Sequence, residues 1–178
     1  MPVYKAILLL HVLASMMLSA CLAVEWSAWT WTAARHAPQE SGRALKTIAQ
    51  AVLGSLVCVV VIAASGAFMV ATAWKRQEWI VAAMVALPPF MMFPALVTLR
   101  KVLALVRRPR DGHGLSAGVQ AVVRGCALQL SLRVRSAIVL GIAYLMVVKP
   151  TWGHAALAMS AFVAAGVATA IPFRSSRP

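Results

Sequence analysis

Long apolar runs constrain this chain of 178 residues more than any other feature. The first run extends from Tyr4 to Trp31, and His11 and Glu25 are its only strongly polar interior residues. A helix of about 20 apolar residues crosses the hydrocarbon core of a bilayer, which is about 30 Å thick. Further runs follow, and 62% of the sequence is hydrophobic, whereas roughly half is usual for soluble domains. The runs therefore predict membrane-spanning helices rather than a water-soluble core.

We predict an all-α fold, a polytopic transmembrane helix bundle that forms a single domain over residues 1–178. About five spans are expected, at residues 4–31, 48–73, 80–99, 126–148 and 152–172. A basic cytoplasmic link is expected at residues 100–125. The fourth span has a short apolar part and includes Arg133 and Arg135. A four-span bundle, in which this segment only re-enters the membrane, is therefore the alternative.

The positive charge is distributed unequally between the links. Thirteen of the 17 Lys and Arg residues fall in the first link, in the third link with the start of the fourth span, and in the C-terminal tail. Five spans place these segments on one side, and cytoplasmic loops are enriched in Lys and Arg. We therefore expect the N-terminus outside and the C-terminus in the cytoplasm. The net charge of +13 lies between apolar runs, which indicates contact with the lipid bilayer and not with nucleic acid.

Motifs that carry chemistry are scarce. The sequence contains no phosphate-binding loop, no HExxH and no GxSxG, and its four acidic residues are too few to suggest paired carboxylates. We therefore assign no catalytic residues and favour a non-enzymatic role. Cys21, Cys58 and Cys126 form no CxxC pair, so we interpret them as small buried residues. Leu18 to Cys21 matches a lipoprotein cleavage pattern, but the apolar run continues through Val24, so we expect this helix to be retained.

Ionisable residues inside a span are costly, which makes each of them a candidate functional residue. Glu25 lies near the cytoplasmic end of the first span, and Arg133 and Arg135 lie at the cytoplasmic end of the fourth. We predict a structural ion pair between Glu25 and one of these arginines, because a partner lowers the cost of both charges. The alternative is that Glu25 reaches interfacial water beside Trp26 while the arginines extend to the headgroups.

His11 is the second candidate, and three interpretations stay open: a structural hydrogen-bonded residue, a ligand, or a proton carrier. His154 begins the last span on the same outer side, and Met159 follows deeper in that span. His11 with His154, or His11 with Met159, is a candidate ligand pair for haem b or copper. Further soft ligands for Cu(I) are available among the sulfur-containing residues Met16, Met17, Met91, Met92 and Cys21.

The stretch Tyr4-x3-Leu8-x2-His11-Val12-Leu13 resembles the opening helix of several small bacterial membrane families. These are an integral-membrane family of uncharacterised function, the copper-resistance D family and the membrane-type protoporphyrinogen oxidases. The ending Leu145-Met146-Val147-Val148-Lys149-Pro150 also resembles the uncharacterised family. The resemblance implies a bacterial inner-membrane location. The oxidase resemblance implies that His11 binds haem and that Lys149 contributes, whereas the copper resemblance implies that His11 and methionines pass metal.

Three functions follow as hypotheses. The first is an accessory subunit of a membrane complex, or a homo-oligomer, because small residues in the second and fifth spans suit helix contacts. The second is a haem- or copper-binding protein that uses His11. The third is a small-solute or ion transporter, because Pro88, Pro89 and Pro94 predict a break in the third span and broken helices often line binding sites.

Overall fold

The computed structural model describes residues 2–34, 38–73, 77–106 and 126–170. Every regular element in these residues is helical, which confirms the all-α prediction for this part of the chain. The helices are α1 (Pro2–Ala34), α2 (Pro38–Thr72), α3 (Glu78–Val106), α5 (Cys126–Val148) and α6 (Trp152–Ala170). The predicted link at residues 107–125 and the end of the chain from residue 171 lie outside the described residues.

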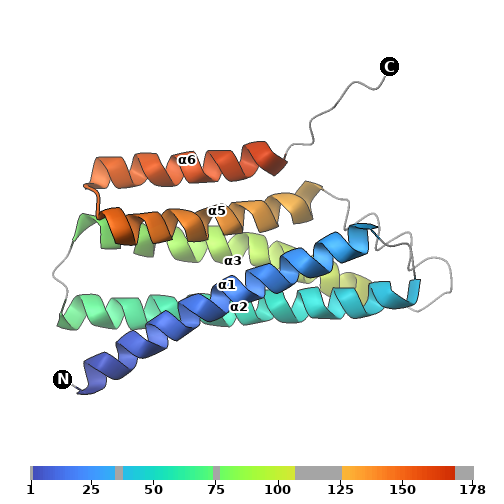
Figure 1. The fold of residues 1–178 in the computed structure, drawn as a ribbon, viewed down its shortest axis with the longest axis horizontal. Helices are drawn as coiled ribbons and strands as arrows, with labels where there is room; N and C mark the ends of the chain where they lie inside the picture. The colour runs from blue at the N-terminus through green and yellow to red at the C-terminus, as the bar shows by residue number, and fades with distance from the viewer. Residues whose placement is uncertain (1, 35–37, 74–76, 107–125, 171–178) are drawn as a thin grey trace.

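The helices lie side by side in an elongated bundle, with α6 on one outer edge and the α1–α2 pair on the other (Figure 1). Neighbours pack in the order α1, α2, α3, α5 and α6, and α1 also touches α5 while α3 touches α6. Close backbone approach between α1 and α6 does not occur in the described part of the chain. This order decides which side chains can meet, and it becomes important for the ligand pairs expected of His11.

Four of the described helices are long and apolar enough to cross a membrane. Their candidate spans are Pro2–Trp31, Arg43–Thr72, Leu128–Val148 and Trp152–Ala170. Within α3, the apolar stretch that the structure describes without a gap is Glu78–Pro88, and the helix itself continues for 29 residues. The prediction of a helical membrane protein is therefore confirmed at this level.

Several helices extend beyond the apolar runs that predicted them. α2 begins at Pro38, ten residues before the expected span, and proline suits a first helical position because its N–H would be unpaired there. α3 continues to Val106 and so takes up the beginning of the predicted basic link. It also runs as helix through Pro88, Pro89 and Pro94, so the expected interruption of this span is absent from the described backbone.

The turn between α5 and α6 has a defined geometry. Lys149 adopts a left-handed conformation with φ of 49°, and its N–H donates to the carbonyl of Leu145 at 2.9 Å, which closes the last turn of α5. Pro150 follows and cannot continue the helix. The backbone N–H of Trp152 donates to Glu78 at 2.7 Å, so the start of α6 is fastened to the start of α3.

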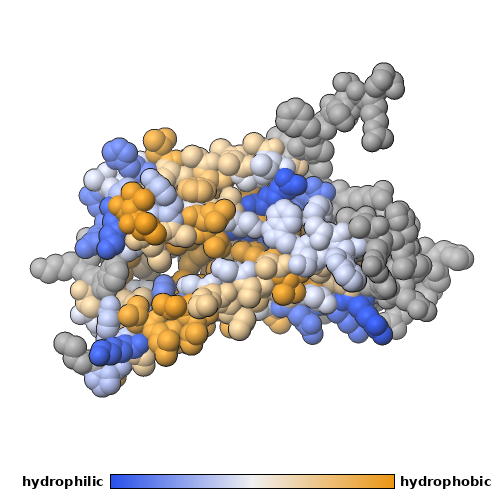
Figure 2. All heavy atoms as spheres, viewed as in Figure 1, coloured by the Kyte–Doolittle hydropathy of each residue, from blue (hydrophilic) through white to orange (hydrophobic). Residues whose placement is uncertain are grey.

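Apolar side chains occupy both the interior and the surface. A larger buried cluster joins all five helices and includes Leu18, Ile62, Leu87, Ile138 and Met159. Figure 2 shows apolar residues over much of the middle of one face and strongly hydrophilic residues towards its two ends. On α1, Leu10, Leu13, Met16 and Met17 are each at least half exposed. Surface of this kind is unfavourable in water but matches hydrocarbon, so lipid contact follows from the arrangement.

Candidate functional site

His11 lines a cavity of about 230 Å³ between four helices. α1, α2, α3 and α5 all contribute to its walls, and Leu8, Ile62, Ala83, Leu87 and Ile142 are among its apolar lining residues. Trp79 is the other lining residue with a polar side-chain atom, and its indole N–H donates to Gln77 at 2.7 Å. Of these two lining residues, His11 is therefore the one whose side chain can offer a nitrogen lone pair to a ligand.

Ser65 of α2 orients the imidazole. The His11 Nδ1 lies 2.9 Å from the Ser65 hydroxyl, and that hydroxyl lies 2.6 Å from the carbonyl of Val61. The Ser65 hydroxyl also lies 3.2 Å from the carbonyl of Ile62, and we assign its single hydrogen to the closer Val61 carbonyl, which makes its oxygen the acceptor for His11 Nδ1–H. In a neutral imidazole this assignment leaves the lone pair on Nε2. Histidine ligands of metals are commonly oriented by a hydrogen bond of this kind at their other nitrogen.

Three methionines line the cavity together with His11. Met69 comes from α2, Met84 from α3 and Met146 from α5. None of them was selected from the sequence, where Met16, Met17, Met91 and Met92 were named instead. Met16 and Met17 are exposed on the outside of α1, and Met91 is buried in the core. The sequence contained no signal that could separate these groups, because the rotation of each helix about its axis decides which methionine faces inwards.

The ligand partners expected for His11 on the last span are not brought to it. His154 is exposed at the start of α6, and its Nδ1 lies 2.9 Å from the Thr151 hydroxyl. Met159 is buried against α5, with its sulfur 2.8 Å from the position that a Cβ at Gly141 would occupy. Neither His154 nor Met159 lines the His11 cavity, and α1 and α6 are not neighbours among the described residues. Both pairs were predicted from position along the helices, and the order in which the helices pack was not predicted.

The described residues contain no group of three or more His, Cys, Asp or Glu side chains that could hold a metal ion. A site of the kind that zinc prefers, built from several nitrogen, thiolate or carboxylate ligands, is therefore not found in this part of the chain. The His11 cavity differs in kind, because its further donors are thioethers. Thioether and imidazole donors together suit Cu(I) better than zinc, calcium or magnesium.

Glu25 and Arg135 form a buried ion pair between α1 and α5. The exposed fractions of the two side chains are 1% and 0%, and Arg135 Nε also donates to the carbonyl of Ser131 at 3.3 Å. Arg133 instead donates to the carbonyl of Thr169 on α6 and lies 5.9 Å from the centre of the Trp26 ring. The structure therefore joins Glu25 to Arg135 and not to Arg133, and the contact links α1 to α5.

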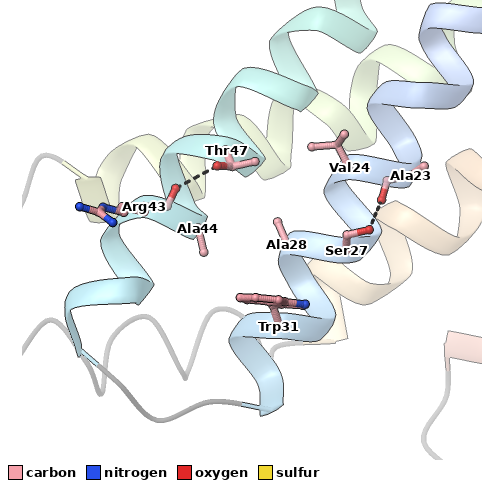
Figure 3. A pocket seen from close by; sticks show the side chains of 8 residues that line it. All are labelled: Ala23, Val24, Ser27, Ala28, Trp31, Arg43, Ala44 and Thr47. Carbon is pink, nitrogen blue, oxygen red and sulfur yellow. Dashed lines mark hydrogen bonds between the residues drawn. The ribbon is translucent and has the colours of Figure 1, made fainter.

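A second cavity, of about 510 Å³, opens between α1 and α2 near their connected ends (Figure 3). Its walls are made mainly of Ala23, Val24, Ser27, Ala28, Trp31, Arg43, Ala44 and Thr47. The Ser27 and Thr47 hydroxyls donate to carbonyls of their own helices, at 2.9 Å and 3.1 Å. Figure 3 shows the Arg43 guanidinium pointing away from Trp31 and from the hollow. The polar side chains named here therefore do not converge on the hollow, and we interpret it as a surface groove.

Comparisons with protein-family models, curated proteins and solved structures give no match to this chain. The resemblance of the first helix to small bacterial membrane families stays a prediction. The assignment of function therefore depends on the geometry around His11.

Proposed function

We propose that the chain is a five-span protein of a bacterial inner membrane, with its N-terminus outside and its C-terminus in the cytoplasm. Four spans follow from length and composition, and α3 supplies the fifth because it lies within the bundle and is 29 residues long. The concentration of Lys and Arg in the first and third links and the tail supports the orientation.

Labelling of single cysteines in intact cells tests this topology. In a variant that lacks the native cysteines, Thr151→Cys in the α5–α6 turn should react with a membrane-impermeant maleimide, because that turn is expected outside. Gly112→Cys in the basic link should react only after the membrane is opened. Labelling of Gly112→Cys in intact cells contradicts the orientation.

We further propose that the protein binds Cu(I) in the cavity around His11. One observation carries this proposal: an imidazole whose Nδ1 is engaged by Ser65 lines the same cavity as the thioethers of Met69, Met84 and Met146. Soft sulfur donors with an imidazole select Cu(I), and a mainly apolar lining disfavours the more strongly hydrated divalent ions. The site residues proposed here share with the sequence-based expectation only His11.

Cavity size favours a bare ion over haem. The cavity of about 230 Å³ is smaller than the roughly 300–1,000 Å³ typical of pockets for drug-sized ligands, and a haem is at least as large as such ligands. A single metal ion with three or four protein donors needs far less room. Copper is therefore the better candidate of the two that His11 suggested.

Metal titration of the purified protein tests the copper proposal. The protein in detergent is titrated anaerobically with Cu(I) against a chromogenic Cu(I) chelator. His11→Ala should lower the number of bound ions by one, whereas His154→Ala is the matched control and should leave it unchanged. Equal Cu(I) binding by His11→Ala and the native protein contradicts the copper proposal. A Soret band in the native protein that disappears in His11→Ala assigns haem instead.

The other two hypotheses have weaker support. An accessory-subunit or oligomeric role rests on the small residues of the second and fifth spans, and two of these, Gly54 and Gly166, face Cys21 and α5 of the same chain. The transporter hypothesis rested on an interrupted third span, and α3 is continuous through its prolines. Co-purification of a stoichiometric partner with a metal-free protein is the result that would favour the accessory role.

A further inference from the structure

Two cysteines meet where α1 crosses α2. The sulfur of Cys21 lies 3.0 Å from the position that a Cβ at Gly54 would occupy, so the thiol fills the notch left by this glycine. Cys58 lies four residues after Gly54, which places both on one face of α2. Both thiols are free rather than joined in a disulfide, and Cys21 is the neighbouring side chain that acts on the Cys58 thiol. A pair of adjacent thiols is thus held between the two helices.

The surroundings of the pair are apolar. Cys58 is 7% exposed and belongs to the buried cluster that contains Leu18, Val59 and Ile62. Ten residues separate Cys21 from His11 along α1, which is about 15 Å at the rise of an α-helix. Because the N-terminus is proposed to lie outside, the thiol pair is nearer the cytoplasm than the His11 cavity and is near the middle of its helix.

We propose that Cys21 and Cys58 form a two-thiolate binding site for Cu(I), which lies further along the α1–α2 contact than the His11 site. This inference rests on the proposed copper function and extends it to a second position. Thiolate sulfur is the softest donor in proteins and binds Cu(I) strongly. The sequence-based interpretation treated the cysteines as small buried residues, because nothing in the spacing of positions 21 and 58 reveals that they meet.

The binding reaction balances without any redox partner. Cu(I) replaces the two thiol protons, two S–Cu bonds form, and the two protons pass to bulk water. No electron is transferred, and the complex carries one negative charge. That charge is spread over the metal and two sulfurs, so its burial costs less than the burial of two separate thiolates.

Anaerobic Cu(I) titration of the full chain in detergent tests this site. The native protein should bind two ions, and Cys58→Ser and Cys21→Ser should each bind one and lose the near-ultraviolet absorption of copper thiolates. Cys126→Ser is the matched control and should bind two. Retention of two ions and of this absorption by Cys58→Ser overturns the inference.

Two further measurements keep the test decisive. Cys58→Ala preserves a small apolar side chain, and native protein in which the two thiols have been oxidised to a disulfide needs no substitution; each should bind one ion. His11→Ala should keep the thiolate absorption. Loss of an ion in His11→Ala but not in Cys58→Ala therefore rejects the thiol site alone, and the reverse result rejects the His11 site alone.

Discussion

Arg135 of α5 and Glu25 of α1 form an ion pair from which water is excluded, and each retains one polar atom, Arg135 Nη1 and Glu25 Oε2, that lacks a partner in the described residues. Such a pair contributes little to stability relative to apolar side chains, since both charges lose their solvation. Removal of one partner alone lowers stability much more, because the remaining charge stays buried without compensation. The pair therefore matters most for the choice of neighbours: α1 joins α5 only in the register that matches the two charges.

Single and double substitutions distinguish these contributions. We expect Glu25→Ala or Arg135→Ala to destabilise the folded protein by roughly 3–5 kcal/mol, because each strands its partner. The double variant Glu25→Leu with Arg135→Met should lose much less than the sum of the two single losses. Unfolding in detergent, followed by circular dichroism, measures the differences.

Arg133→Ala serves as the matched control, because this side chain meets a carbonyl and a ring rather than a carboxylate. The loss of folding stability in Arg133→Ala should be smaller than the loss in Arg135→Ala. An equal loss for the two variants contradicts the assignment of Arg135 as the partner of Glu25.

Two glycines of α6 give a second prediction. A Cβ at Gly166 would lie 3.2 Å from the carbonyl oxygen of Arg133 and 3.3 Å from the Cα of Val134, both of them backbone atoms of α5. A Cβ at Gly153 meets nothing within 4 Å. Gly166→Ala should therefore separate α6 from α5 and lower stability, whereas Gly153→Ala should be neutral or gain up to about 1 kcal/mol from helix propensity. Thermal unfolding of the two variants makes the comparison, and a neutral Gly166→Ala would contradict the close packing.

Ser65 is predicted to act on copper through His11. Ser65→Ala removes the acceptor for Nδ1–H, so the ring loses its fixed orientation, and Cu(I) affinity at the His11 site should fall by roughly 10- to 100-fold. Ser55 is the matched control, since its hydroxyl donates to the carbonyl of Val52 at 2.7 Å in the same helix. Chelator competition provides the affinities, and equal values for Ser65→Ala and Ser55→Ala would exclude a positioning role.

The contact between Cys21 and Cys58 predicts a specific cross-link. Mild treatment with an azo oxidant, which accepts two electrons and two protons, should join the two sulfurs and connect α1 to α2 within one chain. Maleimide counting should then find two fewer thiols, and Cys21→Ser should show no such intrachain loss. An unchanged thiol count in the native protein would place the two sulfurs too far apart.

The sequence predicted best which residues lie at the same level along the helices. The apolar runs and the distribution of Lys and Arg placed Glu25 at the level of the arginines of α5, and the structure joins Glu25 to one of them. Arg133 and Arg135 are two residues apart and so point about 200° apart around the helix. The facing arginine could not be chosen from the sequence, because the rotation of α5 depends on all of its neighbours.

The sequence did not predict which helices are neighbours in the bundle. His154 and Met159 were matched to His11 by depth, but α6 lies beside α5 and α3 and is not beside α1. Ser65 and Cys58 both approach α1 from α2, and neither contact follows from local spacing. Residues with little chemical signal in a linear pattern, such as serine, methionine and an isolated cysteine, acquire their roles only when two helices are placed in register.

The short turn after Lys149 has a consequence for biosynthesis. Three residues separate Val148 from Trp152, so α5 and α6 form an antiparallel hairpin once both have left the ribosome. The Arg133 guanidinium finds its acceptor at the Thr169 carbonyl, near the last turn of α6, and this acceptor is synthesised 36 residues later. We therefore expect a chain truncated after α5 to lack the acceptor for Arg133 and to be degraded faster than the full chain, which a pulse-chase measurement checks.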